Sequence, residues 1–336
     1  MVEGNGILVC GELTEEGQVA PMTFELLGAA RRLAPEVGGE VTCVLLGSGL
    51  DGHAQEAIAH GADRVLLVDD PLLRDYQGDA FVPVVERIVR ERGPALVLLG
   101  QTMVGRDLAP RLAARLGTAV TMDCIELAVQ EGRIVATRPC YGGNAHARYA
   151  FVTSPAVATL RAKSQEPLER DDARQGQVER VEAGLDPAAV RTRILGREKQ
   201  QAEGVRLEDA RVVVSGGRGL GGPEGFQQLE ELASLLGGAV GASRAVCDLG
   251  WYPVSHQVGL TGKVVTPELY IAVGISGASQ HMAGISQVKN IVAINKDADA
   301  NIFKAARWGI VGDWKEIVPL MIEKVKALKA AGKLRA

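Results

Sequence analysis

Aromatic residues, basic charge and long apolar runs are all scarce in this sequence. Phe, Trp and Tyr together make up 4% of the 336 residues, and no run approaches the roughly 20 apolar residues that a membrane-spanning helix needs. The formal net charge is −4, so there is no basic excess. We therefore expect no membrane insertion and no nucleic acid partner, because a nucleic-acid-binding surface is broadly basic.

The sequence also contains no CxxC pair and no secretion-type N-terminal segment. Several of its cysteines lie inside apolar, strand-like runs. The five are Cys10, Cys43, Cys124, Cys140 and Cys247. Buried free thiols are typical of a reducing compartment, so we expect a cytoplasmic protein, although a mature organellar protein would look the same.

Motifs of metal-dependent or nucleophilic catalysis are missing as well. Four of the five histidines have no metal-ligand spacing; these are His53, His60, His146 and His256. No Ser/His/Asp or Cys/His arrangement is suggested by motif. We expect neither a metal site nor a catalytic residue.

Glycine and apolar residues, in contrast, are abundant. The chain has 41 glycines and 46% hydrophobic residues, a balance that favours repeated strand–turn–helix units over an all-β sandwich. In the first part, continuous apolar strands alternate with amphipathic helices, which predicts a parallel sheet covered on both faces. The predicted strands are residues 6–12, 41–47, 63–69 and 95–100.

After residue 118 the pattern changes to successive strands with little helix between them. These are residues 119–129, 133–138, 146–153 and 156–161, and we expect a mixed or antiparallel extension there. The charged stretch 164–210 contains QVERVEA and VRTRILG, which we interpret as edge strands, followed by a linker around 199–208. A plain solvated connector is an equal alternative for the second half of this stretch.

A second α/β unit starts at residues 211–215. A helix is predicted over about 225–237, and further strands over 239–242, 269–273, 290–294 and 309–312. Asp313 opens the final helical stretch, and Pro319 lies too deep for an unbroken helix, so we expect a short turn before the helix proper. The fold class is α/β with two doubly wound domains: residues 1–200, with a linker to about 208, and residues 209–336.

Two glycine-rich loops of the second unit each follow an apolar strand. They are SGGRGLGG (215–222), which carries Arg218, and GISGASQHMAG (274–284), which carries Ser276 and His281. Such loops let backbone amides approach a phosphate, and the dipole of a following helix favours the negative charge. Neither loop matches GxGxxG with a downstream acidic residue, which argues against a conventional NAD dehydrogenase.

The segment between the loops, residues 241–270, has polar residues among glycines and no clear periodicity. An irregular stretch beside two phosphate-type loops suits a surface that wraps a flat ring system. Ser243, Arg244 and Thr261 are the best candidates for ring contacts. A surface salt bridge is an equal alternative for Arg244.

Several motifs together resemble the α subunit of electron-transfer flavoproteins. In the second unit these are SGGRGL, GASRA, VGLTGKVVTPELYIAVGISGASQHMAG and IVAINKD. The first unit contributes GQTMVGRDLAPRLAARLG (100–117) and RPCYGGNAHA (138–147), so that the resemblance covers nearly the whole chain. The resemblance implies that FAD is the cofactor and that the second domain is a parallel-sheet FAD-binding domain.

The resemblance also implies a role for each matching residue. Arg218 and the 276–281 turn would meet the pyrophosphate and ribityl region, Ser243 and Arg244 the reactive ring edge, and Asn295 and Asp313 the adenosine. His281 would lie by the pyrimidine end of the ring; capping its own helix is the alternative role. The full expected set is Arg218, Ser243, Arg244, Val258, Gly259, Thr261, Ser276, Gly277, Ala278, Ser279, Gln280, His281, Asn295 and Asp313. Leu260 departs from the family, which commonly has Gln there, so a flavin contact through that side chain is lost.

The family further implies an obligate heterodimer with a β subunit that completes the FAD pocket. The electron donors would be acyl-CoA or other flavin dehydrogenases, as in fatty acid oxidation, and the acceptor a quinone oxidoreductase. The first domain would be a scaffold for the partner. Three alternatives stay open: a flavin-bifurcating, NADH-oxidising complex, a non-redox adenine-nucleotide-binding regulatory module, and an NAD- or thiamine-type enzyme on the same general fold.

Overall fold

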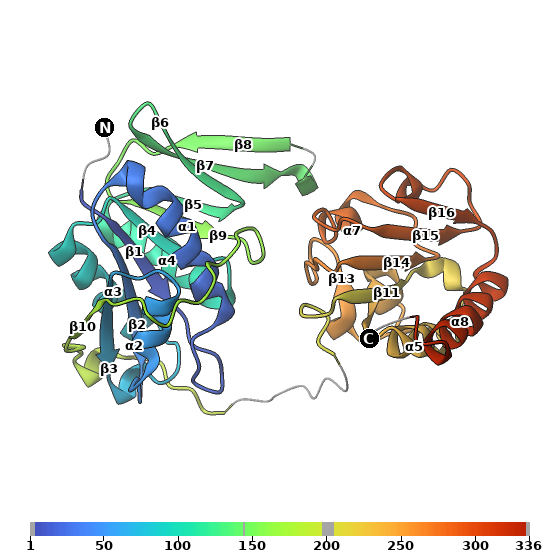
Figure 1. Ribbon diagram of the computed structural model, residues 1–336, viewed down its shortest axis with the longest axis horizontal. Helices are drawn as coiled ribbons and strands as arrows, with labels where there is room; N and C mark the ends of the chain where they lie inside the picture. The colour runs from blue at the N-terminus through green and yellow to red at the C-terminus, as the bar shows by residue number, and fades with distance from the viewer. Residues whose placement is uncertain (1–3, 144, 197–204, 334–336) are drawn as a thin grey trace. The chain divides into compact units, whose positions relative to one another are not determined.

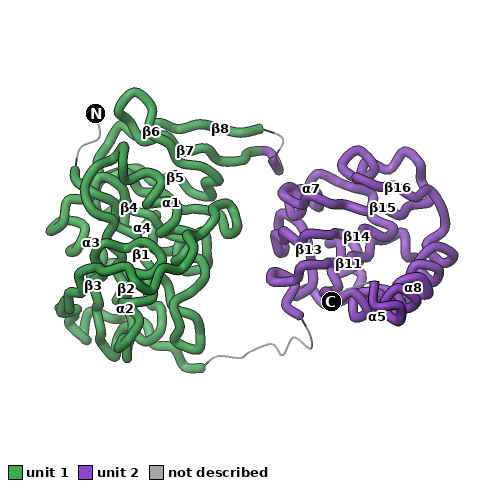
Figure 2. The backbone as a smooth tube through the Cα atoms, viewed as in Figure 1, with its two compact units in different colours: residues 1–140, 145–197 green, residues 141–144, 198–336 purple. Residues whose placement is uncertain are grey.

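The computed structural model describes residues 4–143, 145–196 and 205–333. The chain divides into two compact units (Figure 2). Unit 1 comprises Met1–Cys140 and Ala145–Arg197, and unit 2 comprises Tyr141–Asn144 and Glu198–Ala336. Each unit is built on its own parallel sheet.

Unit 1 contains a seven-stranded sheet in which every neighbouring pair is parallel (Figure 1). Its order is β10-β3-β2-β1-β4-β9-β5. The strands are β1 (Ile7–Gly11), β2 (Val41–Gly47), β3 (Arg64–Asp69), β4 (Leu96–Gly100), β5 (Val120–Cys124), β9 (Ala156–Leu160) and β10 (Gln177–Arg180). The central strands are buried along almost their whole length, as continuous apolar runs require.

Helices cover both faces of this sheet. Side chains of α1 (Pro21–Val37) and α2 (His53–Ala59) share one apolar core with residues such as Val9 and Leu98. Side chains of α3 (Gly78–Arg92) and α4 (Met103–Leu116) share a second core with residues that alternate with these. The doubly wound α/β prediction is therefore confirmed for this unit.

The extension after residue 118 is partly as expected. The strands β6 (Glu126–Gln130), β7 (Arg133–Cys140) and β8 (Ala145–Ala150) form a separate antiparallel sheet. However, β5 and β9 belong to the main parallel sheet, so the predicted run of extension strands was too inclusive. The apolar side chains of β9 are buried between helices and strands, which local pattern alone could not distinguish from a hairpin strand.

The charged stretch 164–196 also differs from its prediction in one place. Residues 177–180 form the edge strand β10, which pairs with β3. The VRTRILG segment, expected as a second edge strand, has no strand structure, and Leu195 in it is 90% exposed. Alternating residues become a strand only where a sheet edge is free to accept them. Residues 199–204 of the expected linker lie outside the described residues.

Unit 2 contains a six-stranded, all-parallel sheet of order β13-β12-β11-β14-β15-β16 (Figure 1). Its strands are β11 (Val212–Gly216), β12 (Ala239–Ser243), β13 (Gln257–Val258), β14 (Leu269–Val273), β15 (Ile291–Asn295) and β16 (Trp308–Val311). The helices α5 (Gly225–Leu235), α6 (Arg244–Asp248) and α8 (Trp314–Ala330) contribute to the core on one face. Ile275, Ile285 and Ile302, which lie in the connections between strands, fill the core on the other face, with Met282 of α7 (Ser279–Ala283) packed against them.

The expectation about Pro319 was wrong. The helix α8 runs unbroken through Pro319, although proline removes one hydrogen bond from a helix interior. Two features compensate for that loss. Asp313 caps the helix by accepting from the Lys315 amide at 3.0 Å, and Val318 and Ile322 are buried in the core.

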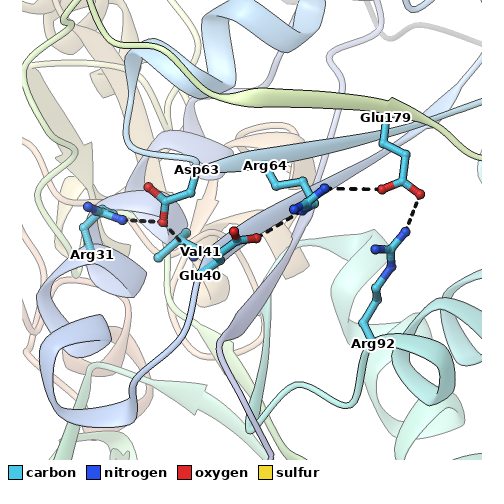
Figure 3. A network of polar contacts seen from close by, with 7 residues as sticks. All are labelled: Arg31, Glu40, Val41, Asp63, Arg64, Arg92 and Glu179. Atoms are coloured by element: carbon cyan, nitrogen blue, oxygen red, sulfur yellow. Dashed lines mark hydrogen bonds and ion pairs between the residues drawn. The ribbon is translucent and has the colours of Figure 1, made fainter.

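A polar network crosses unit 1 where β2, β3 and β10 begin (Figure 3). Asp63 accepts from Arg31 at 2.6 Å and from the Val41 amide at 3.0 Å. Arg64 pairs with Glu40 at 3.1 Å and with Glu179 at 3.6 Å, and Glu179 also pairs with Arg92. These contacts tie the strand starts together, at the edge opposite to the one where parallel sheets bind ligands.

Candidate functional site

The strand order of unit 2 reverses between β11 and β14. The chain proceeds from β11 outward to β12 and β13, and then returns to the other side of β11 with β14, β15 and β16. In open parallel sheets a ligand binds in the crevice outside the carboxyl ends of the strands at this reversal. The two glycine-rich loops follow β11 and β14, so the fold brings both to that crevice.

The two loops approach each other more closely than side chains would permit. Gly217 donates its amide to Val273 at 2.9 Å, and Gly219 donates to Gly274 at 2.9 Å. A Cβ on Gly217 would lie 2.3 Å from the Gly274 carbonyl oxygen, and one on Gly219 would lie 2.8 Å from the same atom. These glycines are therefore required, and they leave bare backbone at the strand ends. Arg218 is exposed between them.

The loop after β14 is held in place by the segment around Ile302, which follows β15. Gly277 has φ +80°, and a Cβ there would lie 2.2 Å from the Ile302 amide nitrogen, so no other residue fits. The Ser276 carbonyl accepts from that amide at 3.1 Å. The remaining members of the expected set here, Ala278, Ser279 and Gln280, are exposed at the start of α7.

The turn after β13 packs directly against α7. The Leu260 amide donates to the Gln280 carbonyl at 2.7 Å, and Gly259, with φ +147°, lies under the same helix. Val258 is buried, whereas Leu260 is 60% exposed. Thr261 accepts a hydrogen bond from Gln257 at 3.0 Å, which orients its hydroxyl.

Ser243 and Arg244 follow β12 at the same edge. Ser243 is the residue before α6, and Arg244 begins that helix. Arg244 pairs with Asp248 at 3.3 Å, and both side chains are well exposed. The surface salt bridge that the sequence left open is thus formed, but such an exposed pair is weak and leaves the guanidinium accessible.

His281 is the one buried histidine of this edge, with 6% of its surface exposed. Its Nε2 lies 2.9 Å from the hydroxyl of Tyr270, which is fully buried in β14. Burial lowers the pKa of His281 to about 4, so the imidazole is neutral at pH 7. Its buried Nδ1 faces the Val258 backbone but makes no hydrogen bond of good geometry in the described part of the chain.

Asn295 and Asp313 follow β15 and β16. Asn295 donates to the Ile275 carbonyl at 2.9 Å and accepts from the Asp297 amide at 3.0 Å. Asp313 caps α8 and pairs with Lys296 at 2.8 Å, contacts that lower its pKa. Both side chains therefore already hold loops of the edge in place.

All fourteen expected residues thus lie at the carboxyl ends of the six strands or in the turns and helix starts that follow them. The two ends of the set, at β13 and β16, are five strand spacings apart, or about 24 Å. The set therefore suits a long ligand lying across the strand ends.

Sequence reasoning missed the buried polar residues behind this edge. Ser215 and Tyr270 are fully buried on β11 and β14, and Gln257 is 6% exposed. Ser215 and Tyr270 occur inside apolar strand runs, where nothing marks them. Gln257 gave a weak signal, as a polar residue before the buried Val258.

A doubly wound sheet with close glycine loops at its reversal point is typical of a dinucleotide-binding protein. The model of the electron transfer flavoprotein domain matches residues 7–186, and that of the electron transfer flavoprotein FAD-binding domain matches residues 206–286. The chain belongs to the electron-transfer flavoprotein α-subunit family, and its cofactor is FAD.

Full-length relatives agree with the family models. The chain is 46% identical to the electron transfer flavoprotein subunit alpha of Thermoanaerobacterium thermosaccharolyticum, over 93% of this chain and 96% of the relative. It is 45% identical to the same subunit of Bacillus subtilis, over 97% and 98%. It is also 37% identical, over 94% of both, to the acryloyl-CoA reductase electron transfer subunit beta of Anaerotignum propionicum. None of the helices in residues 4–143, 145–196 and 205–333 combines the length and apolarity that a bilayer crossing needs.

Proposed function

We propose that this chain binds FAD across the carboxyl edge of unit 2, together with a β subunit, and serves as an electron carrier between flavoproteins. The observation that carries the proposal is the buried Nδ1 of His281, which has no good partner in the described part of the chain. A buried polar atom without a partner is costly. A ligand acceptor at this position would satisfy it.

The residues present fit a flavin dinucleotide. Glycines 217, 219 and 274 let the two loops pack backbone to backbone at the carboxyl ends of β11 and β14, the place where a doubly wound sheet binds a pyrophosphate. Arg218 and residues 276–281 would hold the pyrophosphate and ribityl region. Asn295 and Asp313 would hold the adenosine side.

The ring end has a different set of contacts. Ser243, Arg244 and Thr261 would face the reactive edge of the isoalloxazine, with Val258 and Gly259 beneath, and His281 at its pyrimidine end. FAD, when bound, supplies reversible one-electron chemistry. Arg244 would act as a cation near the ring, and His281 as a neutral hydrogen-bond donor, because its pKa of about 4 keeps it uncharged at pH 7.

The family also guides our proposal for the partners. The relative from Anaerotignum propionicum is named acryloyl-CoA reductase electron transfer subunit beta, which supports an enzyme acting on CoA esters as a redox partner. We propose acyl-CoA or other flavin dehydrogenases as electron donors here, as in fatty acid oxidation. We propose a heterodimer with a β subunit, unit 1 as its scaffold, a quinone oxidoreductase as acceptor, and a cytoplasmic location. The matched FAD-binding domain disfavours a non-redox nucleotide sensor and an NAD- or thiamine-type enzyme.

The test is to co-express the chain with a β-type partner, count the FAD per heterodimer, and follow the visible spectrum during stepwise reduction. One FAD that accepts electrons from an acyl-CoA dehydrogenase supports the carrier. Two FADs with direct reduction by NADH would instead support a bifurcating complex. A colourless complex would contradict the proposal.

A further inference from the structure

The turn that carries Thr261, residues 257–263, is closed by its own backbone. The Lys263 amide donates to the Gln257 carbonyl at 2.7 Å. Gly262 permits this close approach, since a Cβ on it would lie 2.4 Å from the same carbonyl oxygen. Thr261 is exposed at the tip of the turn. The main chain of Lys263 therefore sets the shape of the turn that presents the Thr261 hydroxyl.

One side of the turn rests on α7 and on the residue after it through backbone contacts. The Leu260 amide donates to the Gln280 carbonyl, and the Val265 amide donates to the Gly284 carbonyl at 2.9 Å. Neither contact involves the side chain of Lys263, which points elsewhere.

The other side of the turn lies against residues 205–210, which open the last described part of the chain. Leu207 and Ala210 are 3% and 2% exposed, and they share one apolar core with Val258 and Val265. This short segment is thus anchored at two points against the strand before the turn and the chain after it.

Glu208 lies between these two anchors and binds the Lys263 side chain. Lys263 Nζ lies 2.8 Å from Glu208 Oε1, and the two side chains are 34% and 36% exposed. The neighbouring carboxylate of Asp209 pairs with Arg206 at 3.7 Å instead. Because the backbones of both partners are already fixed, less conformational freedom is lost on pairing than at a typical surface ion pair.

We propose that Glu208 is a positioning residue, which through its ion pair with Lys263 holds the 257–263 turn, and with it the Thr261 hydroxyl, in place. The last residue of the linker that the sequence predicts is thereby part of the support of the ring end of the candidate site. That the turn serves FAD rests on the proposed function; the support of the turn does not.

The test is amide hydrogen exchange, followed by NMR, on the full-length chain without cofactor. The amides of Gly259, Gly262 and Lys263 all donate within the turn. In Glu208→Gln and in Lys263→Met they should exchange about two- to fivefold faster than in the wild type, because each variant removes the same ion pair. The double variant should be no faster than either single variant, and the reversed pair, Glu208→Lys with Lys263→Glu, should slow the exchange again.

Glu268→Gln is the matched control, because Glu268 forms an exposed pair with Arg211 outside the turn, at 3.0 Å. It should leave the three amides at their wild-type rates. The proposal is overturned if Glu208→Gln also leaves them unchanged, or if the two single effects simply add in the double variant. Faster exchange that extends equally to the amides of β14 would mean a general loosening of unit 2 and would overturn it too.

Salt provides a check that needs no variant to fold. In the wild type, exchange of the turn amides relative to those of β14 should become faster as the ionic strength rises, because ions screen the Glu208–Lys263 pair. A ratio that does not change with salt overturns the proposal.

The flavin potentials of the FAD-loaded heterodimer separate positioning from a plain charge effect. Glu208→Gln removes a negative charge and Lys263→Met a positive one, so direct charge effects on the potentials would have opposite signs. Loss of the turn's position has the same sign in both variants. We expect both to shift the potentials in the direction of Thr261→Ala, and by less; opposite shifts overturn the proposal.

Failure of the proposed function is distinguishable from failure of this proposal. If the wild-type heterodimer binds no FAD, or if Thr261→Ala leaves the potentials unchanged, the ring contact assigned to Thr261 fails. The exchange rates of the turn amides still decide whether Glu208 holds the turn.

Discussion

The parallel sheets of the two units share a reversal of strand order, but they differ in the residues that follow the strands. In unit 1 the order also reverses beside the first strand, between β1 and β4. There, Glu12 follows β1 and accepts from Thr102 at 2.8 Å, and burial raises its pKa. Asp69, at the end of β3, accepts from the Gly49 and Leu50 amides at 2.8 Å and 3.0 Å. The carboxylates of unit 1 thus occupy donors that an anionic ligand would need.

Unit 2 has no carboxylate at the corresponding places. Residues 217–222 read GRGLGG and residues 274–278 read GISGA. The comparison teaches that the topology supplies a reversal of strand order in both units, while the first residues after the strands decide whether a ligand can bind there.

The largest expected effect comes from forcing apart the two glycine-rich loops of unit 2. Gly219→Val would place side-chain carbon against the Gly274 backbone, which is 2.8 Å from an added Cβ. FAD affinity of the heterodimer should fall more than roughly 100-fold, a loss above about 2.8 kcal/mol. Fluorescence titration with FAD measures it.

Gly222→Ala is the control within the same loop. Its added Cβ would meet the flexible end of Glu224 rather than backbone, so FAD affinity should stay near the wild-type value. An equal loss of FAD affinity in both variants would mean that any substitution in this loop disrupts binding, whatever its contact with Gly274.

The next largest effect is a shift of the flavin reduction potentials when His281 is removed. The reduced ring carries negative charge, so His281→Ala should make the one-electron potentials more negative. A hydrogen bond to a charged group contributes about 1.5–3 kcal/mol, equivalent to about 60–130 mV. Spectroelectrochemistry measures the shift. His256→Ala is the control, since that ring bonds the Val240 carbonyl at 2.8 Å, and unchanged potentials in His281→Ala would contradict the assignment.

Acid should weaken unit 2 through the same residue. The His281 pKa is about 4 when folded and about 6.5 when unfolded, so below pH 6.5 the unfolded state binds a proton that the folded state does not. Stability therefore falls as the pH falls, by about 2 kcal/mol between pH 6.5 and 5. Burial raises the pKa of Glu12, which acts in the opposite direction in unit 1.

Tryptophan fluorescence can isolate the unit 2 transition. The protein has three tryptophans, Trp251, Trp308 and Trp314, all in unit 2. Urea unfolding followed by this signal should show the acid dependence in wild type and a flatter profile in His281→Gln. The same acid dependence in the variant would rule out His281 as the cause.

The smallest expected effect is on stability at the ring edge. Arg244→Ala removes an exposed ion pair, so the free energy of unfolding should change by less than about 0.5 kcal/mol. The flavin potentials should nevertheless become more negative, as in His281→Ala. Arg211→Ala is the control, because Arg211 forms an exposed pair with Glu268 just before β11, at the opposite end of the sheet. Equal potentials in the two variants would place Arg244 outside the ring site.

The features that short stretches of sequence determine could be predicted. Apolar runs predicted the strands of both parallel sheets, and glycine loops pointed to the sheet edge that carries the candidate site. The prediction of a strand over residues 190–196 was wrong because the sequence pattern does not reveal whether a sheet edge is free to pair. The prediction of a break at Pro319 was wrong because the burial of Val318 and Ile322, which stabilises the helix, is a tertiary effect. The contact of Tyr270 with His281 joins a strand to a helix, and the spacing of the two residues in the sequence does not predict it.

The unpartnered Nδ1 of His281 also bears on how the cofactor-free protein behaves. A folded chain that keeps a buried polar atom unsatisfied carries a local free-energy penalty of about 1–3 kcal/mol. Any ligand group that forms a hydrogen bond with this atom removes the penalty and gains that much affinity without a new charge. Cofactor loading would then act as a late stabilising step of folding, and an empty subunit would be the more readily unfolded and degraded form.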